Sequence, residues 1–395
     1  MGKVEKKKFK VAVLLDASRA YDRDVLKGIT HFNKLYDRFI FFFYSPKYIH
    51  PENQSRLLQR LSGWKPEGII SREMPGIDKL QTWEVPLIVS PHTHLYGGCI
   101  NLWADNKKIG ELAADYFLNK GYKNVGLIGF RKFQWSQERA EGFQDKVAAS
   151  NREQHTFLFD DQQMFWEDLP ALLAQWLKNI PKPCAVFSVT DELNVHLLDA
   201  AKEADYKVPD ELAILGVDND ELLCEMTMPT LSSIDQNALH AGLEIARKLL
   251  HWMDTSQRPE GDVVIQPSSV IERHSTSALA IEDEQVRKAL NYINVHAPDH
   301  DIDVSDVITS TIHSRRILEK KFSQLLDSSI LEEIKKVRIK RIKYLLTESD
   351  LTAQQIAYHM GFGNPDNITR YFKMATGYKP LEYRKEFHRD KNRLK

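Results

Sequence analysis

The sequence predicts a two-lobed α/β body built on parallel sheets, followed by an all-α domain with two helix-turn-helix units. Apolar strand-like runs alternate with amphipathic helical stretches from residue 10 to about residue 220, and that alternation is typical of parallel α/β structure. The pattern starts again after residue 105, which indicates two lobes. Beyond about residue 300 the chain shows only helical periodicity with basic outer faces, so an all-α domain is expected there.

The expected strands of the first lobe are "KVAVLLDAS", "RFIFFFYS", "EGIIS" and "VPLIVS", which begin at residues 10, 38, 67 and 85. A helix through about Leu35 follows the first of them. The second lobe opens with a helix in "ADNKKIGELAADYFLNKGY". Its strands are "NVGLIGF", "HTFLFD", "CAVFSVTD" and "ELAILGVDND", and they alternate with helices that begin at about Ser136 or end near Lys178.

Composition excludes several classes of protein. At 395 residues and 42% hydrophobic content, the chain can form two or three packed domains. It contains no apolar run of about 18 residues, and its basic start leads only into a short apolar stretch, so neither a membrane span nor a signal peptide is expected. The three cysteines are far apart, which fits neither zinc binding nor a disulfide framework. The expected location is the cytoplasm.

Charge is distributed unevenly along the chain. From His313 to the end there are 19 Lys and Arg residues against 10 Asp and Glu residues, a net charge of +9. The rest of the chain carries 35 basic and 45 acidic residues, a net charge of −10. A basic tail on an acidic body predicts that the tail binds double-stranded DNA and that the body does not.

Polar side chains follow the predicted strands, at the ends where α/β sheets bind ligands. Carboxylates and amides at these ends can pair with vicinal hydroxyls, and no cluster of Arg or Lys is evident, which favours an unphosphorylated sugar. Four aromatic residues could stack on its ring, namely Tyr21, Trp103, Phe133 and Trp135. The polar candidates are Asp16, Ser18, Asp191, Asp218 and Asn219, with Asp22 beside Tyr21. Each aspartate alone could instead cap the helix that follows it.

Five blocks of the body, in order, resemble the effector domain of LacI/GalR-type sugar repressors. They are "ADNKKIGELAADYFLNKGYKNVGLIGF", "ERAEGF", "VTDELNVHLLDAAKEADYKVPDELAILGVDNDEL", "PTLSSIDQN" and "VIQPSSVIERHST". The resemblance implies a periplasmic-binding-protein-like pair of lobes with a sugar between them. By position, it implies that Asp105, Arg139, Asp191, Asp218 and Gln236 bind sugar hydroxyls. That family carries its DNA-binding domain ahead of the first lobe, where this chain has only about ten residues.

Residues 356–384 predict the second helix-turn-helix unit, and on this stretch alone an ordinary helical hairpin is the alternative. Apolar residues at helical spacing reach Met360, and Gly361 then stops the helix. Asn364 can cap the next helix, whose inner face is expected from Ile368, Phe372 and Ala375. The predicted DNA-contacting residues of this unit are Asn364, Asp366, Asn367, Thr369, Arg370 and Lys373.

The stretch "DVSDVITSTIHSRRILEKKFSQLL" predicts the first unit, with Ser305 and Ser314 capping its two helices. Its inner stripe is expected from Leu318, Phe322 and Leu325. The leading end of the second helix is where base edges are usually read. The predicted DNA-contacting residues here are Ser314, Arg315, Arg316, Glu319 and Lys320. A helix of about 19 residues, about 28 Å long, is expected between the units.

Both units and the helix between them resemble the DNA-binding domain of AraC-type regulators over about residues 282–388. The segments "SRRILEKKF" and "IAYHMGFGNPDNITRYFKMATGYKPLEYR" carry this resemblance. Ile312 stands where that family usually has a turn glycine, and a β-branched residue resists positive φ, so groove entry by the first unit could be altered. The expected domains are a sensor at 1–275, a linker at 276–285 and a DNA-binding domain at 286–395.

The expected function is a sugar-responsive transcription regulator with no cofactor and no bound metal. A LacI-like sensor ahead of an AraC-like domain implies a pentose effector, D-xylose above all, and activation of sugar-utilisation genes by a homodimer that contacts RNA polymerase. The alternatives are a sugar-binding carrier and a sugar-processing enzyme with a helical tail that does not bind DNA. No phosphate-binding loop, G-x-S-x-G, metal-ligand cluster or C-x-x-C is present, but a catalytic carboxylate pair stays open.

Overall fold

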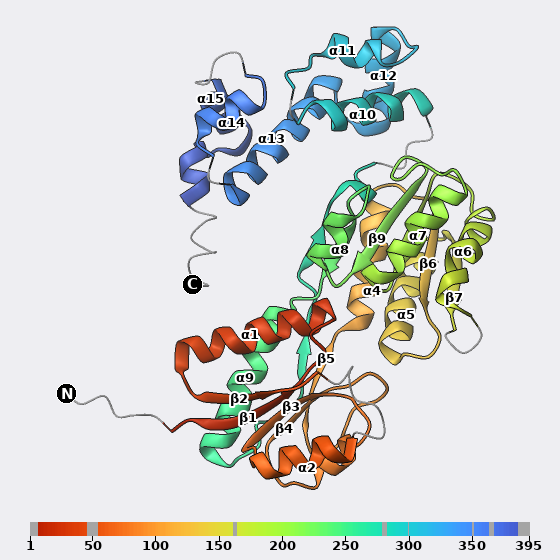
Figure 1. Ribbon diagram of the computed structural model, residues 1–395. Coiled ribbons are helices and arrows are strands. Elements are labelled where there is room, and N and C mark those ends of the chain that lie inside the picture. The colour runs from red at the N-terminus through yellow and green to blue at the C-terminus, as the bar shows by residue number, and fades with distance from the viewer. Residues whose placement is uncertain are drawn as a thin grey trace. The chain divides into compact units, whose positions relative to one another are not determined.

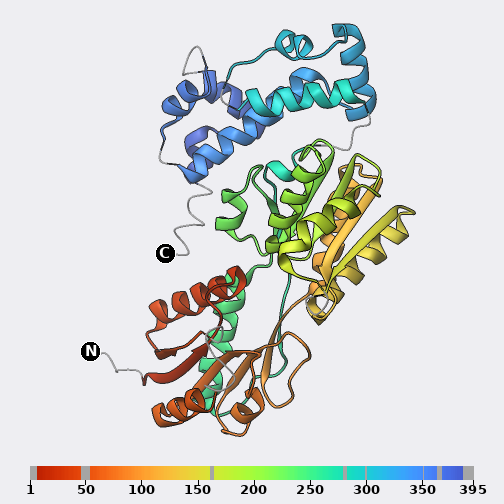
Figure 2. The same cartoon turned by 45° about the vertical axis from the view of Figure 1, so that its right-hand side comes forward.

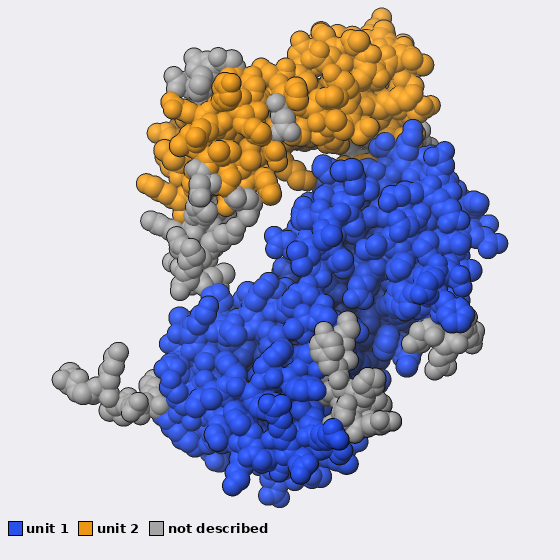
Figure 3. Space-filling model, in the orientation of Figure 1, with its two compact units in different colours: residues 1–276 blue, residues 277–395 orange. Residues whose placement is uncertain are grey.

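The computed structural model describes residues 7–45, 54–160, 164–278, 283–298, 300–349, 351–362 and 367–385. The chain divides into two compact units, Met1–Thr276 and Ser277–Lys395 (Figure 3). Throughout these ranges, no helix is both long enough and apolar enough to cross a membrane.

The first lobe of the first unit is a six-stranded parallel sheet in the order β11, β5, β4, β3, β1, β2 (Figure 1). Its strands are β1 Phe9–Leu14, β2 Phe39–Phe43, β3 Gly68–Arg72, β4 Leu87–Ser90, β5 Ile100–Ala104 and β11 Val263–Ile265. Its helices are α1 Ala20–Tyr36, α2 Gln54–Trp64, α3 Ile77–Gln81 and α9 Ala238–Thr255. Side chains alternate along β1, so Val11 and Val13 pack with α1 and α9, whereas Ala12 and Leu14 pack with α2 and α3.

The second lobe is a six-stranded sheet in the order β12, β10, β9, β8, β6, β7, parallel except for β12 against β10. Its strands are β6 Asn124–Phe130, β7 Glu153–Phe159, β8 Cys184–Ser188, β9 Leu212–Val217, β10 Ser232–Asp235 and β12 Ser269–Ile271. Its helices are α4 Asn106–Asn119, α5 Gln134–Ala149, α6 Leu169–Leu177, α7 Asp191–Glu203 and α8 Glu221–Met226, with short 3₁₀ turns η3 Trp166–Asp168 and η4 His274–Thr276. The two-lobed fold with parallel sheets is thereby confirmed.

The chain passes between the lobes three times, after β5, after β10 and after β11. Two of these passages are tied together, because Gln266 Nε2 donates to Asp105 Oδ2 at 2.9 Å. The third is tied to them through Ser268, whose backbone N–H donates to the carbonyl of Asp235 at 2.9 Å. These three segments therefore form the hinge of the first unit.

Glycines let the paired helices of each lobe approach closely. A Cβ at Gly110 of α4 would lie 2.0 Å from the carbonyl oxygen of Arg139, and one at Gly142 of α5 would lie 2.0 Å from that of Lys107. Gly28 and Gly242 meet in the same way where α1 crosses α9. Only glycine fits such a crossing, and the first pair fixes the position of α5 beside the start of α4.

The second unit consists of helices around two small cores. The labelled helices are α10 Glu284–His296, α11 Val304–Thr309, α12 Arg315–Leu326, α13 Ile330–Glu348, α14 Ala353–His359 and α15 Asn367–Thr376, and residues 380–385 are helical as well. The predicted helix of 19 residues is confirmed as α13 (Figure 2). Its Ile334 packs in one core with Phe322, and its Ile342 packs in the other with Phe372. One rigid helix therefore joins both helix-turn-helix units.

Three local predictions in this unit are wrong. Asp303, not Ser305, caps α11, because its carboxylate accepts from the backbone N–H groups of Ser305 and Asp306. Leu325 is 52% exposed, since the buried stripe of α12 advances by four residues from Phe322 to Leu326. Ala375 is also exposed, in the last turn of α15.

Candidate functional site

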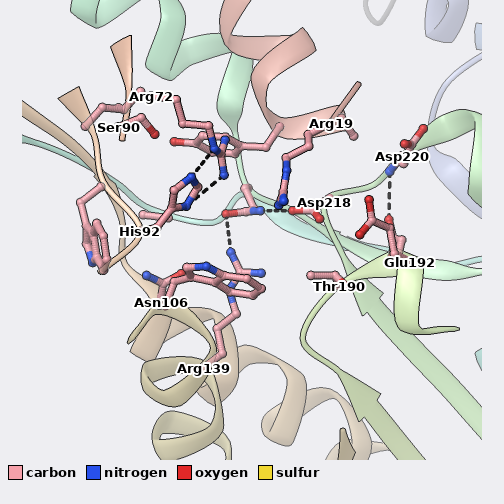
Figure 4. Close-up of a pocket in the computed structure, with 18 of the residues that line it drawn as sticks. Arg19, Arg72, Ser90, His92, Asn106, Arg139, Thr190, Glu192, Asp218 and Asp220 are labelled. Carbon is pink, nitrogen blue, oxygen red and sulfur yellow. Dashed lines mark hydrogen bonds between the residues drawn. The ribbon is translucent and has the colours of Figure 1, made fainter. Parts of the chain in front are cut away.

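A cavity lies between the two lobes of the first unit, at the carboxyl ends of their strands. From the first lobe it is lined by Arg19, Tyr21, Arg72, Ser90, His92 and Trp103, among others. From the second lobe come Asn106, Trp135, Arg139, Thr190, Asp191, Glu192, Asp218, Asp220 and Gln236 (Figure 4). Both sheets thus present polar groups to one space, as parallel α/β sheets do at these ends.

A chain of hydrogen bonds centred on Arg139 runs along the second-lobe wall. The buried guanidinium donates to Asn106 Oδ1 at 3.0 Å, to the carbonyl of Val189 at 2.6 Å and to Gln236 Oε1 at 2.8 Å. Gln236 Nε2 in turn donates to Asp218 Oδ1. Burial raises the pKa of Asp218 to about 6, while the charge of Arg139 acts in the opposite direction. Asp218 therefore presents a poorly solvated carboxyl group to the cavity.

A second cluster lies on the first-lobe wall. Arg72 Nη1 donates to Asp22 Oδ1 at 2.5 Å, and Arg72 Nε donates to His92 Nε2. Burial, reinforced by the positive charge of Arg72, lowers the pKa of His92 to about 2. His92 is therefore a neutral imidazole at physiological pH. Asp22 is fully buried and also accepts from the backbone N–H of Asp16 at 2.8 Å.

At the end of β8, Asp191 and Thr190 each have a buried side-chain oxygen that has no hydrogen-bond partner among the described residues. Asp191 Oδ2 accepts from the backbone N–H of Asp220 at 2.9 Å and from Ser233 Oγ at 3.0 Å. Asp191 Oδ1 and Thr190 Oγ1 are buried without a hydrogen-bond partner among these residues. Burial, together with Asp218, raises the pKa of Asp191 well above its usual range. Since unpaired buried polar groups are costly, Thr190 is suited to bind a polar ligand.

Aromatic rings cover the apolar part of the cavity wall. Tyr21, Trp103 and Trp135 line it. Trp135 stacks on Phe133 with ring centroids 5.6 Å apart and an interplanar angle of 13°, and the guanidinium of Arg139 lies 5.0 Å from the Trp135 ring centroid. Trp103 Nε1 donates to Glu138 Oε2 at 3.1 Å. The rings are thereby fixed before any ligand arrives.

The structure brings half of the predicted sugar-binding residues to the cavity wall. Those that line it are Tyr21, Arg139, Asp191, Asp218 and Gln236. Asp22 does not line the cavity but accepts a hydrogen bond from Arg72, which does. Asp16 accepts a hydrogen bond from Ser18 Oγ at 2.7 Å. Asp105 caps α4, accepting from the backbone N–H of Lys108 at 3.0 Å, and so belongs to the hinge. Asn219 accepts from Arg273 Nη2 at 3.0 Å. Sugar contact by each predicted residue stays a prediction.

Sequence reasoning missed several residues that line the cavity, namely Arg19, Arg72, Ser90, His92, Asn106, Thr190, Glu192 and Asp220. The strand-end rule would have found Arg72, which ends β3, and Ser90, which ends β4. The expectation that no arginines gather at the strand ends is wrong, because three of them line this cavity. They come from distant parts of the chain, so no local sequence window contains them together.

The predicted DNA-contacting residues lie on two helices of the second unit. Ser314 stands at the N-cap position of α12, but its side chain makes no capping hydrogen bond there. Arg315, Arg316 and Lys320 are exposed, whereas Glu319 is half-buried. In the second helix-turn-helix unit, Asn367, Thr369, Arg370 and Lys373 are exposed on α15. Asn364 and Asp366 lie outside the described residues. Both helices therefore present basic side chains to solvent.

The two turns are built differently. Gly361 ends α14 with φ of +73°, as its position predicts, and buried Arg338 donates to the carbonyl of Met360 at 3.1 Å. In the first helix-turn-helix unit, Ile312 is not among the residues with positive φ. Its backbone N–H instead donates to Gln285 Oε1 of α10 at 3.1 Å. The first turn thus closes without a glycine, and the Ile312 side chain is 84% exposed.

Both units match known domain families. Residues 114–276 match the periplasmic binding protein-like domain, and residues 311–386 match a helix-turn-helix domain. Over 391 residues the chain is 27% identical to the xylose operon regulatory protein of Haemophilus influenzae, covering 95% of this chain and 98% of that protein. The corresponding protein of Escherichia coli K12 is 26% identical over 392 residues, covering 96% and 97%.

Solved structures show the same likeness. A xylose-binding transcription activator matches with a TM-score of 0.71 at 25% identity, covering 96% of this chain and 98% of that chain. A LacI-family regulator from Enterococcus faecium with bound ribose shares the fold, with a TM-score of 0.57 at 20% identity over 69% of this chain and 100% of that one. The chain is therefore a transcription regulator similar over nearly its whole length to the xylose operon regulatory proteins, with a periplasmic-binding-protein-like domain followed by a helix-turn-helix domain.

Proposed function

We propose that the protein is a sugar-responsive regulator whose cavity binds a small uncharged sugar, D-xylose, and whose second unit binds operator DNA. The observation that carries the proposal is the composition of the cavity wall. It combines fixed aromatic rings with carboxyl, amide and guanidinium groups from both lobes. Such groups can exchange paired hydrogen bonds with the hydroxyls of a pyranose while the rings cover its apolar face.

The charge balance of the cavity supports an uncharged ligand. Each of its three arginines has an acidic group nearby. Arg72 is paired with Asp22 at 2.5 Å, and Arg19 lies 3.7 Å from Asp16. Arg139 is linked to Asp218 through Gln236. An anionic sugar would compete with these carboxylates for the guanidinium groups, whereas a neutral polyol would use the hydrogen-bonding capacity that the pairs leave over.

The choice of D-xylose rests on the relatives, which are named as xylose operon regulators and as a xylose-binding activator. The likeness to a transcription activator supports activation of sugar-utilisation genes, and we propose that the protein acts as a homodimer that contacts RNA polymerase. For DNA binding, the support is the net charge of +9 from His313 onward and the exposed basic residues on α12 and α15. Helix α13, about 28 Å long, could hold both helices near adjacent major grooves about 34 Å apart.

Thermal and chemical unfolding of the full chain with candidate sugars tests the proposal. A ligand at about 100 times its dissociation constant should add about 2.7 kcal/mol to the free energy of unfolding. D-xylose should do so, and a xylose phosphate should not, because each of the three arginines that line the cavity has an acidic group nearby. Failure of every pentose and hexose to stabilise the chain would contradict a sugar sensor, and steady conversion of a sugar to product would establish an enzyme instead.

A further inference from the structure

One ion pair joins the two lobes beside the cavity. Arg23 Nη2, on α1 of the first lobe, donates to Asp220 Oδ2, on the second lobe, at 2.7 Å. Arg23 is itself fixed, because its Nη1 donates to the carbonyl of Ser18 at 2.8 Å. The two side chains are 32% and 12% exposed. The pair is thus partly shielded from water, and its strength depends on how close the lobes stand.

Asp220 connects three parts of the molecule at once. It lines the cavity, and its Oδ1 caps α8 by accepting from the backbone N–H of Leu222 at 3.2 Å. Its own backbone N–H donates to Asp191 Oδ2. Leu223 of the same helix also lines the cavity. A change in the spacing of the lobes or in cavity occupancy therefore acts directly on the first turn of α8.

The other side of α8 is tied to the segment that leaves the first unit. Glu225 accepts from Arg273 Nε at 2.7 Å, and Arg273 also donates to the carbonyl of Leu231 at 3.0 Å. Immediately after Arg273, Ser275 and Thr276 are fully buried and anchored, with Ser275 Oγ donating to the carbonyl of Ile214 at 2.6 Å. The second unit begins at the next residue. The Glu225–Arg273 contact therefore connects α8 to the last residues before the second unit.

We propose that Arg23 and Asp220 hold the lobes in the sugar-binding arrangement, and that α8, through Glu225 and Arg273, transmits that arrangement to the segment leading to the DNA-binding unit. Arg23, Glu225 and Arg273 are positioning residues in this scheme, and only Asp220 faces the ligand. The inference rests on the proposed function, because it concerns how the same cavity controls DNA binding. Loss of Arg23 or Asp220 is expected to weaken sugar binding. Loss of Glu225 or Arg273 is expected to weaken the effect of sugar on DNA binding.

The first experiment tests the interlobe ion pair by calorimetry with D-xylose. Loss of the pair in Arg23→Gln favours separated lobes, so sugar affinity should fall roughly two- to fivefold at low salt, and less at high salt. Lys27→Gln is the matched control. Lys27 lies one turn further along α1, and among the described residues its ion pair is with Asp24 of the same helix and not with the second lobe.

Asp220→Asn keeps an oxygen to cap α8 while removing the charge, and it completes a double-mutant cycle with Arg23→Gln. If the two residues act through each other, the affinity loss of the double variant should be smaller than the product of the single losses. Equal affinities for Arg23→Gln and Lys27→Gln, or strictly multiplicative losses in the cycle, would overturn this half of the proposal.

The second experiment measures how strongly D-xylose changes affinity for a DNA fragment that the full chain selects from a random pool. Glu225→Ala should retain the sugar affinity of the wild type, because Glu225 is 57% exposed and is not among the residues that line the cavity. The sugar-dependent change in DNA affinity should nevertheless shrink several-fold. Glu221→Ala is the control, an exposed glutamate on the same helix. Arg273→Gln should reproduce the effect of Glu225→Ala.

The outcomes distinguish a failure of the proposed function from a failure of the α8 connection. A wild-type chain that binds DNA equally with and without every sugar contradicts the proposed function itself. A wild-type chain that responds to D-xylose, together with a Glu225→Ala variant that responds as strongly as Glu221→Ala, leaves the proposed function standing and overturns the α8 connection. Circular dichroism and unfolding midpoints of each variant distinguish loss of coupling from loss of fold.

Discussion

At the scale of single residues, Asp218 is the residue on which sugar binding should depend most. It is held by Gln236 and electrostatically balanced by Arg139 within the hydrogen-bonded chain of the second lobe. Asp218→Ala should leave buried sugar hydroxyls unpaired and cost about 1 to 3 kcal/mol of binding free energy. Calorimetric titration with D-xylose measures this. Asp105→Asn, at the hinge, serves as the comparison, and equal affinities of Asp218→Ala and the wild type would remove Asp218 from the site.

The raised pKa of Asp218 also predicts a pH dependence of stability. The native carboxyl keeps its proton up to about pH 6, whereas the unfolded chain releases it near the ordinary value of 3.8. The native state therefore binds more protons in this window, and this group lowers the free energy of unfolding as pH rises from about 4 to 6. Asp218→Asn should remove that fall. Urea unfolding of both proteins at several pH values tests it, and identical pH profiles would contradict the shift.

Local sequence was enough to predict some site residues and not others. Asp191 and Asp218 were predictable because they follow strands, whose carboxyl ends meet at one edge of a sheet. The sequence does not decide whether Asp105 contacts sugar or caps α4, because its hydrogen-bond partner in the hinge, Gln266, comes from a distant part of the chain. Pairing of Asp22 with Arg72 likewise joins α1 to β3, and only the folded sheet brings them together.

At the scale of secondary-structure elements, the crossing of α4 and α5 positions Arg139. Gly110→Ala would place a Cβ 2.0 Å from the carbonyl oxygen of Arg139, so the helices must separate. This should cost at least about 1 to 3 kcal/mol of stability and weaken sugar binding as well. Gly63→Ala in α2 is the control, since nothing lies within 4 Å of its Cβ, and it should be neutral or slightly stabilising. Similar melting temperatures for the two variants would contradict the crossing.

In the second unit, α12 and α15 should read DNA from the exposed leading residues of each helix. If Arg316 reads a guanine edge, Arg316→Ala should cost about 1 to 3 kcal/mol and relax preference at one base pair. Selection from a random DNA pool measures that preference, and Arg370→Ala applies the same test to α15. A uniform loss across all sequences, with a smaller salt slope, would show that the arginine contacts phosphate instead.

Helix periodicity predicted α13 and both inner stripes well, but not their ends. Phe322 and Phe372 are buried as the spacing requires, whereas Leu325 is 52% exposed because Leu326 takes its place in the core. The first turn needed no glycine, since Gln285 of α10 satisfies the backbone of Ile312. That contact spans 27 residues, so a motif confined to the turn could not reveal it.

At the scale of the whole molecule, the order of domains was predictable, because each unit has its own periodicity and its own charge. Residues 1–276 alternate expected strands and helices and carry a net charge of −5, whereas residues 277–395 carry +4, because the +9 from His313 onward outweighs the −5 before it. The residues proposed to connect the first unit with the second were not predictable from pattern, because Arg23, Asp220 and Arg273 come from three distant segments. Control of DNA binding by sugar is the central claim at this scale.

Affinity of the full chain for its selected DNA fragment, measured by fluorescence anisotropy with and without saturating D-xylose, tests that claim most directly. Allosteric coupling of about 1 to 3 kcal/mol should change the dissociation constant roughly 5- to 150-fold. A flexible Gly/Ser insertion after Ser277 should preserve sugar binding and DNA binding but abolish the change. The same dissociation constant with and without sugar in the wild type, despite sugar binding shown by calorimetry, would contradict the account.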